Sequence, residues 1–297
     1  MMALSRFFNS ADPCEIGEVL QFAEDHVDPN DQDSIFGAAE VLHRLSQKKD
    51  LLNDLIIEPI KNTIDESQPE NIYTDATFIL GSTKSGIFRL RANVWKVPKA
   101  RGGKDEFEKR LYAYEAPHDH NFDFLTAGYY GSGYETDLYE YDYESMLPKV
   151  GEKVAVRFIE RTNLSIGKVM MYRRSRDIHT QHPPIDLSVS VNLLVSTEDQ
   201  LTRQQQYFDV HHQVSAGFVD GPVSFRVDLI EMAGHLGLQN AVEPLHRIAS
   251  AHSCKRSRAA AVKSILKIAP GENESIRSKY GSDTSRIVRD ACFSDIY

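Results

Sequence analysis

The chain has 297 residues, of which 41% are apolar and 26% charged, as in an ordinary globular protein. Its net charge of −9 argues against a grip on the phosphate backbone of nucleic acid. No apolar run reaches the roughly 18 residues of a membrane span, and the N-terminus lacks the features of a secretory leader. Three widely separated cysteines, Cys14, Cys254 and Cys292, suggest reduced thiols and a cytoplasmic protein.

The first part of the chain, residues 1–71, has the apolar spacing of helices. Asp12 is a capping residue and Pro13 suits a first helical position, so a helix is expected to begin there. Further helices are expected from about 33–34 and from Asp50, with a kink or restart at Pro59. Their apolar faces are expected to face a core.

Residues 72–224 have a different texture, with short aromatic and β-branched segments between turns rich in Gly, Pro and Asp. The strands expected are 78–80, 87–95, 134–141, 154–158, 166–172 and 187–195. The glycines of Gly131-Ser132-Gly133 predict a hairpin turn, so 134–141 should return beside the strand before it. Many short strands at close spacing predict an antiparallel sandwich or barrel.

Residues 225–297 turn helical again, with helices expected at 227–236, 241–252 and 257–269. Parts of this segment, 236–245 and 258–262, resemble one unit of a HEAT-type helical repeat. Because a single repeat cannot form a solenoid, we expect a helical cap packed on the β domain.

Two histidines, His118 and His120, are separated by one residue in the segment 117–124. In a strand, residues two apart point to the same face, so the two imidazoles would project side by side. That geometry places both rings on one small cation. The sequence therefore predicts a metal site here, for which a third ligand is needed.

The best candidate for the third ligand is His179, which precedes the strong strand signal of 187–195. His182 competes for this place, although Pro183 and Pro184 should pull it into an extended exit. The pair His211-His212 is a further candidate in a polar segment.

Three neutral imidazoles leave open coordination positions and suit Fe(II), with Zn, Ni, Cu or Mn as other divalent metals. An open iron site can bind substrate and O₂ together. Dependence on 2-oxoglutarate normally goes with two histidines and one carboxylate, a set that the sequence lacks in clear form. An oxygenase without 2-oxoglutarate is therefore the favoured function.

With these motifs, residues 85–195 resemble the cupin superfamily of double-stranded β-helix metal proteins. Within it they look most like mononuclear non-heme iron oxygenases of the cysteine-dioxygenase type, which carry His-x-His on one strand and a third His before a strong strand. The resemblance implies an α+β fold, with a central antiparallel cupin β-barrel flanked by N-terminal and C-terminal helices. It also implies an iron cofactor on His118, His120 and His179.

The sequence departs from the common cupin pattern where a glutamate is usual. Phe124 and Leu125 occupy those places, and Asp123 lies one position early, as a candidate catalytic carboxylate. Tyr129 and Tyr172 are candidates to donate a proton or line the substrate pocket. A carboxylate ligand to the metal is therefore not expected.

Arg89 and Arg91 lie on one face of the strand 87–95. In the thiol dioxygenases that this region resembles, an arginine on such a strand binds the substrate carboxylate, a task that suits the guanidinium fork. In the alternative, Phe88 and Leu90 face inward and both arginines form a charged stripe in solvent.

The first hypothesis is thus a cytoplasmic iron dioxygenase or oxygenase that acts on a small carboxylate-bearing substrate, an amino acid or thiol, with O₂. The second is a metal-dependent isomerase, lyase or hydrolase, and the third is a ligand-binding regulatory protein. No nucleic-acid or membrane partner is expected, and the sequence leaves the oligomeric state open.

Overall fold

The structure, a computed structural model, describes residues 5–9, 11–62, 76–99 and 104–293. It divides the chain into two compact units, the first Met1–Tyr141 with Val156–Thr197 and the second Asp142–Ala155 with Glu198–Tyr297. The predicted boundary at 71–72 lies outside the described residues. Among those described, none of the helices has both the length and the apolar character that crossing a membrane requires.

The first unit contains two antiparallel sheets. Its strands are β1 (Ser5–Phe7), β2 (Thr77–Ser82), β3 (Phe88–Trp95), β4 (Asp123–Tyr130), β5 (Glu135–Glu140), β6 (Arg157–Asn163), β7 (Lys168–Tyr172), β8 (Asp177–Gln181) and β9 (Ser188–Val195). The larger sheet has the order β1-β7-β4-β9-β3-β2 and the smaller one β6-β5-β8. The fold is therefore α+β with antiparallel sheets, and the described strands pair as separate sheets where a closed barrel was predicted.

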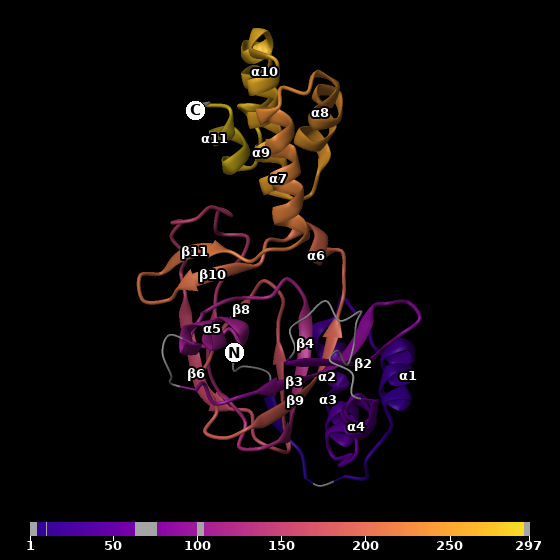
Figure 1. The fold of residues 1–297 in the computed structure, drawn as a ribbon. Coiled ribbons are helices and arrows are strands. Elements are labelled where there is room, and N and C mark those ends of the chain that lie inside the picture. Colours follow the sequence, from indigo (N-terminus) through magenta and orange to yellow (C-terminus); the bar gives the residue numbers. More distant parts are fainter. Residues whose placement is uncertain (1–4, 10, 63–75, 100–103, 294–297) are drawn as a thin grey trace. The chain divides into compact units, whose positions relative to one another are not determined.

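The N-terminal helices cover one face of the larger sheet, as the indigo ribbons of Figure 1 show. They are α1 (Ile16–His26), α2 (Gln32–Gly37), α3 (Ala39–Ser46) and α4 (Asn53–Asn62), and α5 (Lys104–Leu111) follows later in the chain. Leu90 and Ala92 of β3 and Leu125 of β4 are buried in the core that these helices form with the sheet. Strand alternation then turns the residues between them to the other face.

That other face carries a second, aromatic core. Trp95, Phe124 and Tyr172 of the larger sheet pack in one cluster with Leu138 of β5. The first unit therefore has three layers, in which the helices, the larger sheet and the smaller sheet follow one another. The candidate site lies in the layer between the two sheets.

The predicted hairpin at Gly131 to Gly133 is wrong. Strand β4 pairs with β7 and β9, whereas β5 pairs with β6 and β8. Both glycines have positive φ angles, +80° and +78°, so the turn is real. The turn carries the chain from the larger sheet to the smaller one, and the pairing partners of β4 and β5 all come from later parts of the sequence.

The second unit combines a hairpin with a group of helices. Its strands are β10 (Gln206–Asp209) and β11 (Val214–Phe218), and its helices are α6 (Asp199–Thr202), α7 (Pro222–His235), α8 (Val242–Ala251), α9 (Lys255–Ile268), α10 (Asn273–Tyr280) and α11 (Arg286–Ala291). Helix α9 packs against α7, α8 and α11, and its small residues Ala259 to Ala261 allow this close packing. The three predicted helices correspond to α7, α8 and α9.

Candidate metal centre

The three predicted histidines meet in the first unit. His118 and His120 lie in the segment just before β4 and not within a strand, so the predicted strand is wrong there. His118 instead forms an isolated antiparallel bridge with His179, the middle residue of β8. The amide of each donates to the carbonyl of the other, across 3.1 and 2.9 Å. This bridge aligns the two segments and brings the third histidine to the first two.

The ring nitrogens converge on a single point. The Nε2 atom of His179 lies 3.0 Å from Nε2 of His118 and 3.0 Å from Nε2 of His120. Imidazole nitrogens bind zinc at 2.0–2.1 Å, so two of them at right angles around such an ion lie about 3.0 Å apart. The spacing therefore fits one small transition-metal ion. Within the described residues, this is the one group of three or more His, Cys, Asp or Glu residues with such geometry.

All three imidazoles are held neutral. Burial lowers the pKa of His118, and it lowers the pKa values of His120 and His179 well below the usual range. The neighbouring histidines lower the last two further, and Arg91 adds to the effect on His120. Neutral imidazole is the form that binds a metal ion.

The protonation pattern gives a second test of the fit. Nδ1 of His118 lies 2.8 Å from the carbonyl oxygen of Ala116, to which it donates, so its Nε2 carries a lone pair. A neutral ring nitrogen has one in-plane position, used either by a proton or by a lone pair. Nε2 of His179 can therefore make only one well-aligned hydrogen bond, yet it has two nitrogen neighbours at 3.0 Å. A cation between the three nitrogens satisfies all of them.

Aromatic rings hold the imidazoles in place. The ring centroid of His120 lies 5.0 Å from that of Phe124, in an edge arrangement. Tyr172 stacks on Phe124 at 4.7 Å and lies 4.5 Å from His179. Because these rings are fixed by the aromatic core, the three imidazoles are held in a pre-organised arrangement.

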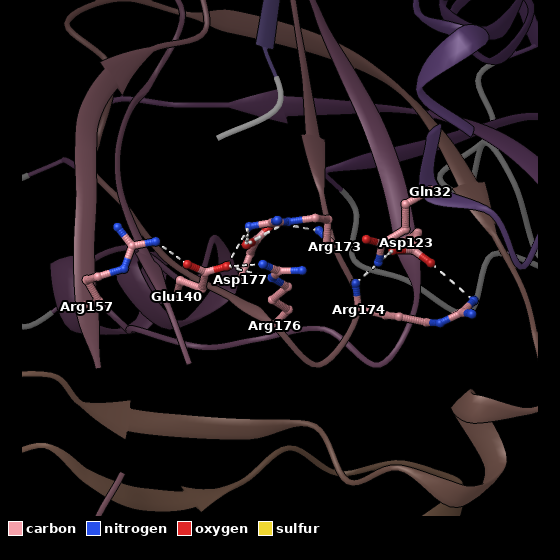
Figure 2. Close-up of polar contacts among 8 residues, drawn as sticks. All are labelled: Gln32, Asp123, Glu140, Arg157, Arg173, Arg174, Arg176 and Asp177. Carbon is pink, nitrogen blue, oxygen red and sulfur yellow. Dashed lines mark hydrogen bonds and ion pairs between the residues drawn. The ribbon is translucent and has the colours of Figure 1, made fainter. Parts of the chain in front are cut away.

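An ion-pair network links the turn between β7 and β8 to β5 and to the start of β8 (Figure 2). Arg173 is 4% exposed and binds the carboxylate of Asp177 at the start of β8, with nitrogen–oxygen distances of 2.6 to 3.1 Å. Glu140 of β5 joins this group through Arg173, across 3.5 Å, and it also binds Arg176, across 2.5 Å, and Arg157. The network fixes the turn between β7 and β8, from which the amide of Ser175 donates to the His120 carbonyl across 2.7 Å.

A cavity of about 200 Å³ opens beside the histidines. Arg91 lines it, because Leu90 and Ala92 take the opposite, helix-covered face of β3. The other lining residues combine amides with aromatic rings: Asn93, Asn192, Gln181, Trp95, Tyr112, Phe124 and Tyr134 are among them. A cationic fork, neutral amides and flat apolar walls are groups that suit a small polar molecule with a negative charge.

Other predicted residues do not reach this cavity. The hydroxyl of Tyr129 donates to the carbonyl of Lys49 across 3.0 Å, and its ring packs on the helix side of the sheet. Asp123 is fully buried and binds Arg174, which contacts it through its backbone amide at 2.9 Å and its side chain at 3.1 Å (Figure 2). Asp123 shares the parity of Leu125 along β4, so alternation turns it away from the histidines, whereas Tyr129 lies at a strand irregularity between Gly128 and Tyr130 and is placed by its packing on the helix-side core.

The remaining candidate residues also lie outside the cavity wall or outside the histidine group. Tyr172 packs behind His179 and is not part of the cavity wall, and neither is Arg89. His182 lies 3.0 Å from the carboxylate of Asp137 and outside the histidine group. His212 belongs to the second unit, where its Nδ1 lies 2.6 Å from Asp209.

The sequence did not predict that Asn93, Asn192 and Trp95 line the cavity. Asn93 shares the face of Arg91, so the alternation of β3 could have identified it once the inner face was known. Asn192 is the register partner of Arg91 on β9 and donates to Oδ1 of Asn93 across 2.9 Å. This strand pairing joins distant segments, which no local pattern shows.

Comparison with known proteins leaves the family open. No protein-family model and no curated protein matches the chain. Solved structures match weakly. RmlC from Streptococcus suis in complex with dTDP-D-xylose has 11% identity and a TM-score of 0.21, and the match covers 40% of this chain and 50% of that one. The DMSP lyases RdDddP and RnDddQII have 11% identity and a TM-score of 0.26 over 63% of this chain and 76% of that one, and prolyl 4-hydroxylases from Phytophthora capsici have 10% identity and a TM-score of 0.24 over 94% and 83%. The match thus spans half the length of the RmlC chain. Likeness at these TM-scores does not establish a common fold or activity.

Proposed function

We propose that the first unit is a cupin-like, metal-dependent oxygenase with one divalent ion on His118, His120 and His179. Its substrate is a small carboxylate-bearing molecule, an amino acid or thiol, and it works without 2-oxoglutarate. The observation that carries the proposal is the triangle of neutral Nε2 atoms on the buried His118 and His179 and the half-buried His120, two of whose sides measure 3.0 Å. The spacing fits a bound cation, and neutral imidazoles alone do not satisfy it.

The donor set supports Fe(II). A group of three imidazoles, with no carboxylate in it among the described residues, differs from the two-histidine, one-carboxylate set that goes with 2-oxoglutarate. When bound, Fe(II) in such a site supplies open positions at which substrate and O₂ can meet. The aromatic rings of Phe124 and Trp95 give that space apolar walls.

The cavity supports a carboxylate substrate. Three neutral ligands leave the charge of a divalent ion uncompensated, and Arg91 adds a further positive charge at the cavity wall. A buried anion needs such partners, because an unpaired charge costs several kcal/mol. The volume of about 200 Å³ lies below the range of pockets for drug-sized ligands, which favours a molecule of amino-acid size.

A metal-dependent isomerase, lyase or hydrolase is the second candidate, because three histidines are also the ligand set of catalytic zinc. The test is metal analysis of protein purified without oxygen, followed by oxygen-electrode assays of the iron-loaded and zinc-loaded protein against small amino and thiol carboxylates. We expect oxygen uptake with iron only. Turnover with zinc, and no oxygen uptake with iron, would favour the second candidate and contradict the first.

A further inference from the structure

Helix α7 of the second unit exposes a continuous apolar stripe. Phe225, Leu229, Met232 and Leu236 are 65%, 48%, 52% and 65% exposed. Their spacing of four, three and four residues places them on one face of the helix. We refer to these four residues as the α7 stripe.

The opposite face of α7 is already part of the core. Val227 and Ile230 are buried in the cluster that α7 forms with α9. Gly234 lies so close to α9 that an added Cβ would come within 2.7 Å of the Ser264 hydroxyl, which donates to the Ile230 carbonyl across 2.8 Å. A helix that is apolar on both faces has the composition of a buried helix, yet only one face is covered in the described structure.

We propose that the α7 stripe is the interface of a homodimer, in which α7 packs antiparallel against α7 of a second copy. The four-three-four spacing is that of a coiled-coil seam. Antiparallel packing puts Phe225 opposite Leu236 of the partner subunit, and Leu229 opposite Met232 of the partner subunit. The two-fold arrangement makes each contact twice, as an isologous interface requires. Because α9 already holds α7 in its helical form, association need not order the helix.

The charges beside the stripe favour the antiparallel direction. Asp228 and His235 are exposed and lie seven residues apart, so they flank the same side of the stripe. Nζ of Lys267 lies 3.4 Å from Nε2 of His235, which makes that end of the stripe cationic. Antiparallel packing sets Asp228 beside His235 and Lys267 of the partner subunit, whereas parallel packing sets Asp228 level with its own copy.

The area of the stripe is sufficient for a reversible dimer. Four half-exposed side chains, together with the neighbouring Leu238 at 43% exposure, offer on the order of 450 Å² of apolar surface per copy. Two copies then bury on the order of 900 to 1,000 Å², which is near the lower limit of specific interfaces. We therefore expect a dimer that dissociates on dilution.

The first test is the oligomeric state of the full chain, measured by sedimentation velocity from about 1 to 200 μM, a range in which a dimer of this area exchanges with monomer. Met232→Glu puts two carboxylates near the two-fold axis and should weaken the dimer about 30-fold or more. Ile185→Glu, at an 88% exposed apolar residue of the first unit, is the control and should remain dimeric. Circular dichroism and metal content verify that each variant is folded. A monomeric wild type over the whole range, or a folded Met232→Glu dimer, would overturn the proposal.

A charge exchange tests the direction of packing. Asp228→Lys alone and His235→Glu alone each bring like charges together across the interface, so each should weaken the dimer. The double variant restores opposite charges and should recover most of the wild-type affinity. A double variant that associates no better than the single ones would overturn the antiparallel arrangement.

Discussion

His179 and His182 are three residues apart, yet only His179 joins the histidine group. An odd separation turns the two side chains to opposite faces of an extended chain, and His182 binds Asp137 instead. We predict about one divalent ion per chain in the wild type, and its loss in His179→Ala, because two imidazoles hold such an ion weakly. Elemental analysis after dialysis measures this directly.

The matched control is His182→Ala, which removes an imidazole of the same segment and should retain the ion. Full metal occupancy in His179→Ala, with loss in His182→Ala, would show that the wrong histidine has been assigned.

Arg91 and Arg89 provide a second matched pair, because they lie two residues apart on β3 and only Arg91 lines the cavity. Given the proposed carboxylate substrate, Arg91→Lys keeps the charge but loses one of two parallel hydrogen bonds. Hydrogen bonds to charged groups contribute about 1.5 to 3 kcal/mol, so KM should rise about 10- to 100-fold while the metal content is unchanged. Arg89→Lys should leave KM near the wild-type value. Steady-state assays that find equal effects for both variants would exclude Arg91 as the substrate-binding arginine.

At this scale, the sequence allowed His118 and His120 to be predicted because their spacing is local, and His179 because a strong strand signal follows it. The inner face of the strand 87–95 could not be predicted, since alternation leaves two choices until the sheet is known to pack on helices. Tyr129 and Asp123 were misplaced for the same reason. The run from Phe124 to Ala127 is buried throughout, so hydrophobicity alone does not distinguish its two faces.

The turn between β4 and β5 depends on Gly133. Its φ angle is +78°, and an added Cβ would overlap the carbonyl oxygen of Leu164. Gly86 has a similar φ of +73° but open space around it, so it serves as the control. We predict that Gly86→Ala costs about 1 kcal/mol of unfolding free energy, the usual cost of a left-handed alanine, and that Gly133→Ala costs about 3 kcal/mol or more. Urea unfolding measures both, and equal costs would mean that the close approach to Leu164 does not matter.

Strand existence was easier to predict than strand pairing. The segments 87–95 and 187–195 contain uninterrupted apolar or alternating residues, and they correspond to β3 and β9. Strand β8 was missed because Asp177 to Gln181 is mainly polar and is buried through the ion pair of Asp177 and the histidine group of His179, without an apolar run. The partner strands of β4 and β5 are distant in the sequence, so a turn motif between them suggested a hairpin that does not form.

At the scale of the whole molecule, the first and last parts of each unit come from separate stretches of the chain. The segment Asp142–Ala155 belongs to the second unit, although the strands on either side of it, β5 and β6, pair within the first. A unit boundary predicted from the change between strand-like and helix-like composition does not detect this inserted segment, because composition is averaged over neighbouring residues. The hairpin of β10 and β11 has the composition of strands, yet it belongs to the unit that is otherwise helical.

This division allows the unfolding of the first unit to be followed separately. Trp95 is the one tryptophan of the sequence and lines the histidine cavity, so tryptophan fluorescence reports on the first unit. Circular dichroism at the helical minimum reports on both units, because the described helices α1 to α5 hold 43 residues and α7 to α11 hold 52. A ligand that binds only the folded state stabilises it by about 2.7 kcal/mol at a hundredfold excess over its Kd. For a unit of this size, that corresponds to roughly 5 to 10 °C in Tm.

We therefore predict that a chelator lowers the Tm seen by Trp95 fluorescence by this amount and leaves in place the part of the helical transition that comes from the second unit, because the proposed ion would be held by residues of the first unit alone. His179→Ala provides the control: it should start at the lower Tm and not respond to chelator. If the whole helical transition shifts together with the fluorescence in the wild type, the units unfold as one. If neither shifts while metal analysis shows the ion removed, the ion does not stabilise the fold, and the histidine triangle is held by its aromatic and ion-pair surroundings without it.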